Sequence, residues 1–133
     1  ARNAGVKVAR GKYVAFCDAD NHVTENLLVL IHDHLENPKI AGGGTWIEPA
    51  SHNLKIDFFY TLWGIYVRCS RVGVGMLHCR KADFEAFGGF DETIYAAEDV
   101  QLAYDLKKIG KPRGQKFNLI HKGWIVTSGF VPL

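Results

Sequence analysis

Residues 13–22 read YVAFCDADNH, an apolar run followed at once by two aspartates, Asp18 and Asp20. A continuous apolar run between helical segments predicts a strand buried on both faces, as parallel strands usually are. Residues two apart in an extended segment point to the same side, so both carboxylates can reach one point. Two carboxylates at a strand end suit Mg²⁺ or Mn²⁺. Taken alone, however, a pair of turn-forming aspartates is the commoner explanation of D-x-D.

The composition is that of one globular domain. The chain has 133 residues, 47% hydrophobic and 23% charged, with a formal net charge of +2. This charge is too small to indicate a nucleic-acid partner, and no apolar run approaches the roughly 18 residues of a membrane span. Cys17, Cys69 and Cys79 lack any C-x-x-C spacing. We therefore predict reduced thiols and a cytoplasmic protein, at most peripheral to a membrane.

Hydrophobic periodicity predicts alternating helices and strands along the chain. Thr24 is the expected N-cap of the second helix, and the Gly42–Gly44 run is expected to allow close backbone approach. In the last helix, Val100, Ala103, Tyr104 and Lys107 share one face. The alternation indicates an α/β fold with a mixed sheet in a single domain. Helices are expected over 2–10, 24–36, 55–67, 81–87 and 97–110, and strands over 13–17, 40–48, 72–79, 116–121 and 124–128.

A second acidic pair, Glu98-Asp99, opens the last predicted helix. Carboxylates in a first turn complement the helix dipole, which is one sufficient explanation of the pair. The alternative is that the helix start holds Asp99 ionised, ready to accept a proton from a hydroxyl group. Adjacent helical residues do not share a face, so the two carboxylates would have separate functions.

The motifs together resemble a family 2 glycosyltransferase with the GT-A fold. RNAGVKVARGKYVAFCDAD is followed by FGGFDETIYAAEDVQLAYDLKKIG, and the order and spacing of these motifs are specific. The match covers most of the chain, and residues 51–71 are its least typical part. The resemblance implies a partial GT-A (Rossmann-like) mixed sheet flanked by helices. Complete domains of the family begin with nucleotide-binding strands that are missing here, so we expect residues 1–133 to form a single, N-terminally truncated domain.

The resemblance also assigns functions to the acidic residues. Asp20 matches the aspartate that holds a divalent cation on the sugar nucleotide diphosphate, and Asp18 the one near the ribose or the metal's water shell. Asp99 matches the catalytic base of inverting enzymes, and Glu98 its neighbour in the acceptor site. Arg2 resembles a nucleotide-contacting arginine.

His121 is a candidate third metal ligand, because it ends a predicted strand and some GT-A relatives carry a downstream histidine ligand. The expected reaction is the metal-dependent, inverting transfer of a sugar from a nucleotide-sugar donor to an acceptor hydroxyl, with Mg²⁺ or Mn²⁺. The alternative is a non-catalytic or binding-only remnant that forms homo-oligomers through an exposed sheet edge or the aromatic segment 58–66. A nucleotidyltransferase, with a similar sheet and metal chemistry, is the third hypothesis.

Overall fold

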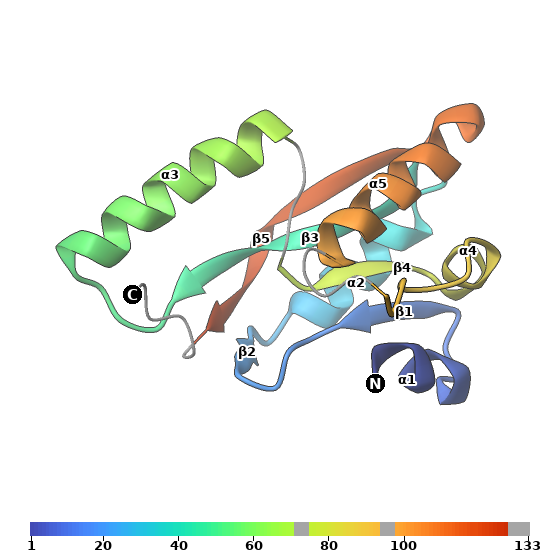
Figure 1. The fold of residues 1–133 in the computed structure, drawn as a ribbon, viewed down its shortest axis with the longest axis horizontal. Coiled ribbons are helices and arrows are strands. Elements are labelled where there is room, and N and C mark those ends of the chain that lie inside the picture. The colour runs from blue at the N-terminus through green and yellow to red at the C-terminus, as the bar shows by residue number, and fades with distance from the viewer. Residues whose placement is uncertain (71–74, 94–97, 128–133) are drawn as a thin grey trace.

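The computed structural model describes residues 1–70, 75–93 and 98–127 (Figure 1). Helices and strands alternate along most of this chain, as the periodicity predicts. Its elements are α1 (Arg2–Val8), β1 (Tyr13–Phe16), β2 (Asn21–Val23), α2 (Leu27–Glu36), β3 (Ile40–Pro49), α3 (Leu54–Ser70), β4 (Leu77–Arg80), α4 (Lys81–Ala86), α5 (Glu98–Gly110), the short 3₁₀ helix η1 (Lys111–Arg113) and β5 (Lys116–Thr127).

The strands form one mixed five-stranded sheet in the order β1-β4-β3-β5-β2. β3 and β5 are parallel, and the other paired strands are antiparallel. Helices α1, α4 and α5 pack on one face, around side chains such as Val6, Phe84 and Leu106. Helix α2 covers the other face through Leu27 and Ile31. The predicted mixed α/β sheet flanked by helices is therefore confirmed, and it is consistent with a partial GT-A domain.

Strand β1 differs from the prediction of a buried parallel strand. Val14 and Phe16 do pack toward α1 and α4, while Tyr13 and Ala15 pack toward α2, so helices cover both faces. The strand nevertheless pairs antiparallel with β4 and lies at the edge of the sheet, and only Val14 within it is fully buried. Its apolar run reflects coverage by helices and not a central place in the sheet.

The two strands predicted over 116–121 and 124–128 are one strand, β5, as far as Thr127. Its pairing with β3 continues through a register shift, from Ile120 opposite Thr45 to Trp124 opposite Trp46. The extra residues on β5 form a local irregularity, and β5 pairs with β3 again beyond them. A break in the hydrophobic pattern was therefore wrongly interpreted as the end of a strand.

Two further local predictions were wrong. Helix α2 begins at Leu27 with Asn26 as its N-cap, and residues 21–23 before it pair with β5 as strand β2. The Thr24 hydroxyl donates instead to the Trp124 carbonyl at 3.1 Å. Helix α5 buries Leu102, Ala103 and Leu106. Of the predicted face, Ala103 is buried and Val100 packs against the core, while Tyr104 stays 54% exposed.

The remaining boundaries agree more closely. Helix α1 ends at Val8 rather than residue 10, and β4 begins at Leu77; of the residues predicted to precede it, 72–74 lie outside the described residues. The expected close approach at the glycine run is confirmed at Gly43, where a Cβ would lie 2.1 Å from the Asn118 carbonyl oxygen. Within the described residues, no helix is long and apolar enough to cross a membrane.

Candidate active site

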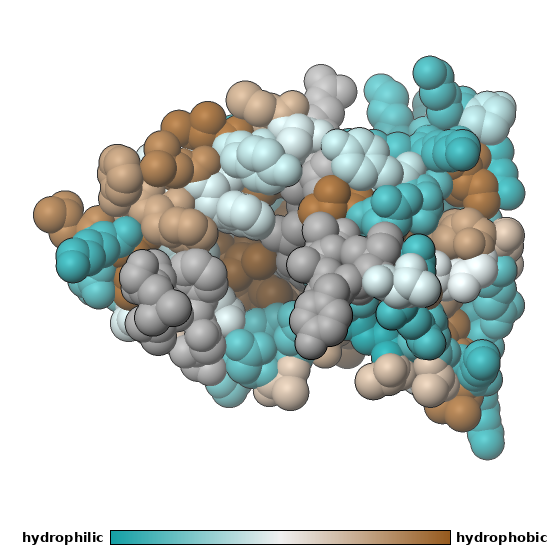
Figure 2. Space-filling model, in the orientation of Figure 1, coloured by the Kyte–Doolittle hydropathy of each residue, from teal (hydrophilic) through white to brown (hydrophobic). Residues whose placement is uncertain are grey.

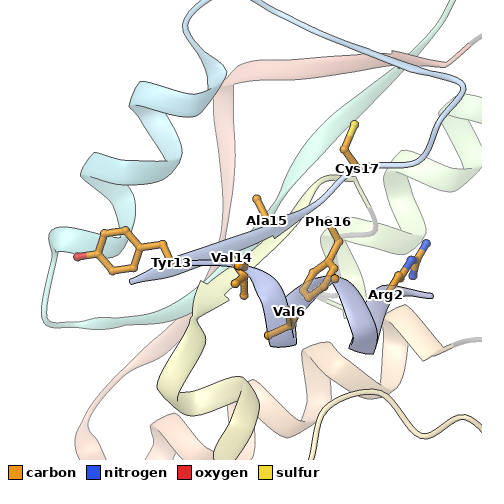
Figure 3. Close-up of a pocket in the computed structure, with 9 residues that line it drawn as sticks. Arg2, Val6, Tyr13, Val14, Ala15, Phe16 and Cys17 are labelled. Atoms are coloured by element: carbon orange, nitrogen blue, oxygen red, sulfur yellow. The ribbon is translucent and has the colours of Figure 1, made fainter. Parts of the chain in front are cut away.

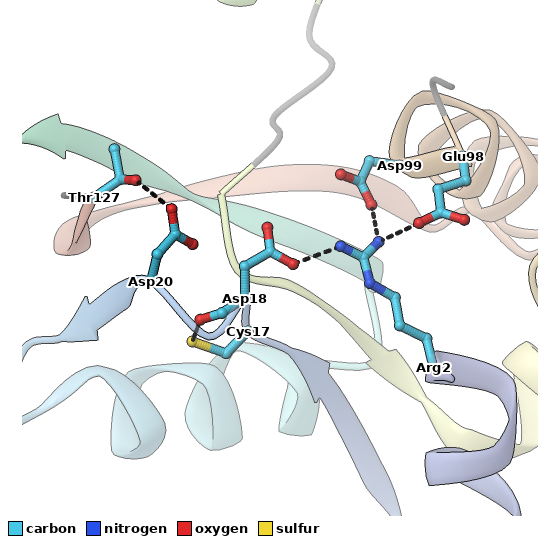
Figure 4. A network of polar contacts seen from close by, with 7 residues as sticks. All are labelled: Arg2, Cys17, Asp18, Asp20, Glu98, Asp99 and Thr127. Carbon is cyan, nitrogen blue, oxygen red and sulfur yellow. Dashed lines mark hydrogen bonds and ion pairs between the residues drawn. The ribbon is translucent and has the colours of Figure 1, made fainter. Parts of the chain in front are cut away.

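Arg2 joins three carboxylates from distant parts of the chain (Figure 4). Its Nη2 lies 2.6 Å from Asp18 Oδ1, and its Nη1 lies 2.6 Å from Asp99 Oδ1 and 2.9 Å from Glu98 Oε1. Asp18 follows β1, whereas Glu98 and Asp99 form the first turn of α5. The structure thus brings four of the six residues singled out in the sequence into one network.

Asp20 lies on the same loop as Asp18 but outside the Arg2 contacts. The loop turns tightly, since the Asp18 carbonyl accepts the backbone N–H of Asn21 at 3.1 Å, and strand β2 follows at once. The hydroxyl of Thr127 donates to Asp20 Oδ2 at 3.4 Å. Both carboxylates rise from the same side of the loop, Asp18 reaching Arg2 and Asp20 reaching the end of β5 (Figure 4).

The environment of Asp99 favours its protonated form. Burial raises the pKa of this carboxyl above its ordinary value, Arg2 partly opposes that rise, and the nearby charges of Asp18 and Glu98 add to it. Burial lowers the pKa of Arg2, but its bonds to Asp18 and Asp99 raise it overall, so the guanidinium stays charged. Asp99 is therefore a better proton acceptor than an exposed aspartate.

Asn3 fixes the segment that leads toward α5, a function that sequence reasoning did not assign. Its Oδ1 accepts the Phe90 N–H at 2.9 Å, and its Nδ2 donates to the Phe90 carbonyl and to Glu92 Oε1, each at 2.9 Å. Gly89 has φ +78°, and a Cβ there would lie 2.7 Å from Asn3 Oδ1. The adjacent residues Arg2 and Asn3 thus hold the acidic helix start and the glycine turn before it. The two motifs, RNAG and GGFDE, were visible in the sequence, but nothing in the sequence showed that they are in contact.

A cavity of about 430 Å³ opens beside β1, at the edge of the sheet (Figure 3). It lies between α1 and β1, and Arg2 connects it to the acidic network. In Figure 3, Val14 and Phe16 point toward α1 while Tyr13 and Ala15 point the other way. Its lining is formed by Arg2, Gly5, Val6, Ala9 and residues 13–17.

His121 is not brought to this network. It is exposed on β5 and lines a separate hollow with Val67 and Arg68 of α3. Six residues of β5, with the irregularity at residues 121–123 among them, separate it from Thr127, which contacts Asp20. Across residues 1–70, 75–93 and 98–127, no three or more His, Cys, Asp or Glu side chains form a metal-binding group.

Comparison with known proteins shows a similarity in the N-terminal part of the chain. Residues 1–62 match the family described as Glycosyl transferase family 2. These residues span α1, β1, β2, α2, β3 and the start of α3, and they include Arg2, Asp18 and Asp20. A comparison with curated proteins found no match. Residues 1–62 are therefore similar to part of a family 2 glycosyltransferase domain.

Proposed function

We propose that the acidic network is the catalytic-centre portion of a metal-dependent, inverting glycosyltransferase. The enzyme would move a sugar from a nucleoside diphosphate donor to an acceptor hydroxyl. The family assignment supports sugar transfer. The proposed location of the catalytic centre depends on one observation. Arg2 contacts both Asp18, which follows β1, and Asp99, at the start of α5, and so holds the two carboxylates close together.

Asp99 is the proposed general base. Its raised pKa suits a group that must take a proton near neutral pH, and Arg2 fixes the position of its Oδ1. The acceptor hydroxyl loses its proton to Asp99 and forms a new bond to the anomeric carbon, while the bond to the diphosphate breaks on the opposite face. Attack opposite the leaving group inverts the configuration at that carbon. Glu98, one residue away, would contact the acceptor.

Asp18 and Asp20 are the residues that would hold Mg²⁺ or Mn²⁺. The Asp18 side chain is 56% exposed, and Asp20 is also exposed, so both carboxylates are open to solvent and to a substrate. These cations take oxygen ligands and commonly use one or two carboxylates plus phosphate oxygens, which fits this donor set. A bound cation would offset the negative charge that develops on the departing diphosphate. His121 stays a less favoured third ligand, because its hollow is separate from Asp20.

A reducing compartment suits the thiols of this chain. Cys17 and Cys69 are exposed and free, and Cys79 is buried and free. Exposed unpaired thiols are typical of cytoplasmic proteins. We accordingly place the proposed activity in the cytoplasm or at the cytoplasmic surface of a membrane.

The experiment is a donor screen with product stereochemistry. The intact chain is incubated with a panel of nucleoside diphosphate sugars and simple glycoside acceptors, with Mg²⁺, Mn²⁺ or a chelator. Proton NMR reports the anomeric configuration of any product. The proposal expects metal-dependent release of nucleoside diphosphate and a product of inverted configuration. A retained configuration, or turnover that is equal in chelator, would overturn it.

A second candidate is a binding-only remnant that associates through the edge of the sheet. It is favoured by the place of β1 at that edge and by the cavity beside it. An exposed strand edge is a template for pairing with another chain. Calorimetry with UDP and Mn²⁺ separates the two functions: tight binding counts against the remnant, whereas no binding and no turnover of any donor in the screen support it.

A further inference from the structure

Helix α3 is apolar on the face that points away from the sheet. Ile56, Gly64 and Val67 form its buried side, and Trp46 of β3 packs against Gly64. Helix α3 lies apart from the other helices in Figure 1, and hydrophobic atoms gather over it in Figure 2. Its outer side carries large apolar side chains that are 50–88% exposed: Leu54, Phe58, Leu62, Ile65 and Tyr66. A helix that is apolar on both sides is normally covered on both sides.

The outer face has the spacing of a helix–helix seam. Phe58, Leu62, Ile65 and the exposed Cys69 follow one another at intervals of four, three and four residues. This is the alternation of core positions in a coiled coil, and it places the four side chains in one narrow stripe. The stripe therefore fits the corresponding stripe of another helix better than it fits a flat surface.

We propose that α3 packs antiparallel against α3 of a second copy of this chain. A two-fold axis near the centre of the helix places Phe58 against Cys69 of the partner subunit. The same axis places Leu62 against Ile65 of the partner subunit. The largest side chain of the stripe then faces the smallest, as close packing requires, and the same patch serves both subunits.

The charges beside the stripe are self-complementary in this arrangement. Asp57 and Arg68 lie on the same flank of α3, one near each end. Antiparallel pairing brings Asp57 next to Arg68 of the partner subunit and opposes the two helix dipoles. Within the described chain, Asp57 contacts His52 at 2.9 Å, and Arg68 makes no ion pair with another described residue. Because this flank carries both a negative and a positive charge, it fits a second copy better than an anionic lipid surface, which attracts basic residues.

The apolar area that the two α3 helices bury determines the affinity expected for the dimer. Five large side chains, each contributing on the order of 100 Å², bury about 500 Å² per subunit and about 1,000 Å² in total. That total lies at the lower limit of specific interfaces. We therefore expect a reversible dimer with a dissociation constant in the micromolar range.

Disulfide trapping tests the arrangement directly. Phe58→Cys is introduced into the intact chain with Cys17→Ser, and the protein is oxidised mildly. Positions 58 and 69 of one helix are about 16 Å apart, too far for a disulfide within a chain, so a bond between them must join two subunits. Lys108→Cys, also exposed but on helix α5, is the matched control. Covalent dimers joined between positions 58 and 69 are expected to form about tenfold faster than dimers of the control.

Analytical ultracentrifugation with Leu62→Glu gives the second measurement. Leu62 is 51% exposed, so the variant should fold, and its thermal melting curve verifies this. A charge at the centre of the seam is expected to raise the dissociation constant at least about tenfold. The proposal is overturned by a chain that stays monomeric, by unchanged association of Leu62→Glu, or by disulfides that join Cys69 to Cys69. It is also overturned if the monomer binds phosphatidylcholine–phosphatidylserine vesicles through Leu62, since lipid would then be the occupant.

Discussion

Arg2 Nη1 lies 2.6 Å from Asp99 Oδ1, so the first residue of α1 is bonded directly to the first turn of α5. The other guanidinium nitrogen holds Asp18 at the same distance. One cation therefore sets the relative positions of the loop after β1 and the acidic helix start. The proposed site depends on this connection, because neither carboxylate is anchored to the other along the chain.

Asp99→Asn is expected to leave the fold as stable as before, or more stable, at pH 7. The folded state raises the pKa of Asp99 above its ordinary 3.8, chiefly by burial, so the folded chain binds the proton more tightly than the unfolded chain. This contribution to stability is complete below pH 3.8 and is lost as pH rises through the folded pKa. At pH 7 the buried charge is unfavourable, and asparagine removes it.

The measurement is the free energy of unfolding as a function of pH, for the wild type, for Asp99→Asn and for Asp105→Asn, which is the control. Asp105 lies on the same helix and bonds only to the nearby Gln101 among the contacts described for it. The difference between Asp99→Asn and the wild type should shrink as pH falls toward 3.8. A clear loss of stability in Asp99→Asn at pH 7 would show that its bond to Arg2 outweighs burial.

Asn3→Ala should destabilise the chain by about 2 kcal/mol, because it removes three hydrogen bonds to the turn at Phe90 and Glu92. It should also lower any sugar transfer, since this turn precedes α5. Asn26→Ala is the control: Asn26 caps α2 without a side-chain hydrogen bond, so its loss should be nearly neutral. Urea unfolding of both variants gives the comparison. Equal stability of the two variants would exclude the positioning function of Asn3.

The sequence predicted the existence of most elements but not their partners. The spacing of Leu27, Ile31 and Leu35 indicated α2, because a helix is stabilised by contacts three and four residues apart. Strand pairing involves residues far apart in the sequence. The direction of β1 is set by β4, more than sixty residues later, and nothing in the run YVAF records it. For the same reason, the continuity of β5 depends on its neighbour β3.

The candidate site was also only partly predictable from the sequence. The residue types at Asp18, Asp20 and Asp99 were visible in the sequence, and the resemblance gave them functions. Their meeting through Arg2 was not predictable from spacing, since it depends on α1 and α5 packing on the same face of the sheet. Whether Arg2 also contacts a nucleotide stays a prediction.

A histidine pair, with His78 buried and His34 half-buried, should make the fold sensitive to mild acid. His78 Nδ1–H donates to the Met76 carbonyl at 3.0 Å, so its Nε2 accepts from His34 Nδ1–H at 2.9 Å. Burial lowers the pKa of His78 to about 4, from the ordinary 6.5. Its contribution to stability is present above pH 6.5 and is lost as pH falls toward 4, by about 3 kcal/mol in total.

The pH dependence of unfolding tests this pair. His78→Gln should show a much smaller loss of stability between pH 6.5 and pH 4 than the wild type. His22→Gln, at an exposed position on β2, should keep the wild-type slope. If His78→Gln has the same slope as the wild type, His78 is not the group that titrates.

Gly43→Ala should be strongly destabilising, because its Cβ would lie 2.1 Å from the Asn118 carbonyl oxygen on the neighbouring strand β5. Backbone cannot move aside as a flexible side chain does, so we expect a loss of about 2–3 kcal/mol. Gly5→Ala is the opposite case. Outside its chain neighbours and its own helix backbone, no described atom lies within 4 Å of a Cβ at Gly5, and alanine in the interior of α1 should add about 0.5–1 kcal/mol. Thermal unfolding that ranks the two variants alike would contradict the strand spacing.

The most direct test of the proposed centre is the rate of metal-dependent nucleoside diphosphate release, with the donor found in the screen, in Asp99→Asn and Asp105→Asn. If Asp99 is the base, Asp99→Asn should lower kcat by about 10²–10⁴-fold, whereas Asp105→Asn should keep the wild-type rate. Donor binding should survive in both variants. Equal turnover by Asp99→Asn and the wild type would contradict the assignment of the acidic network as the catalytic centre.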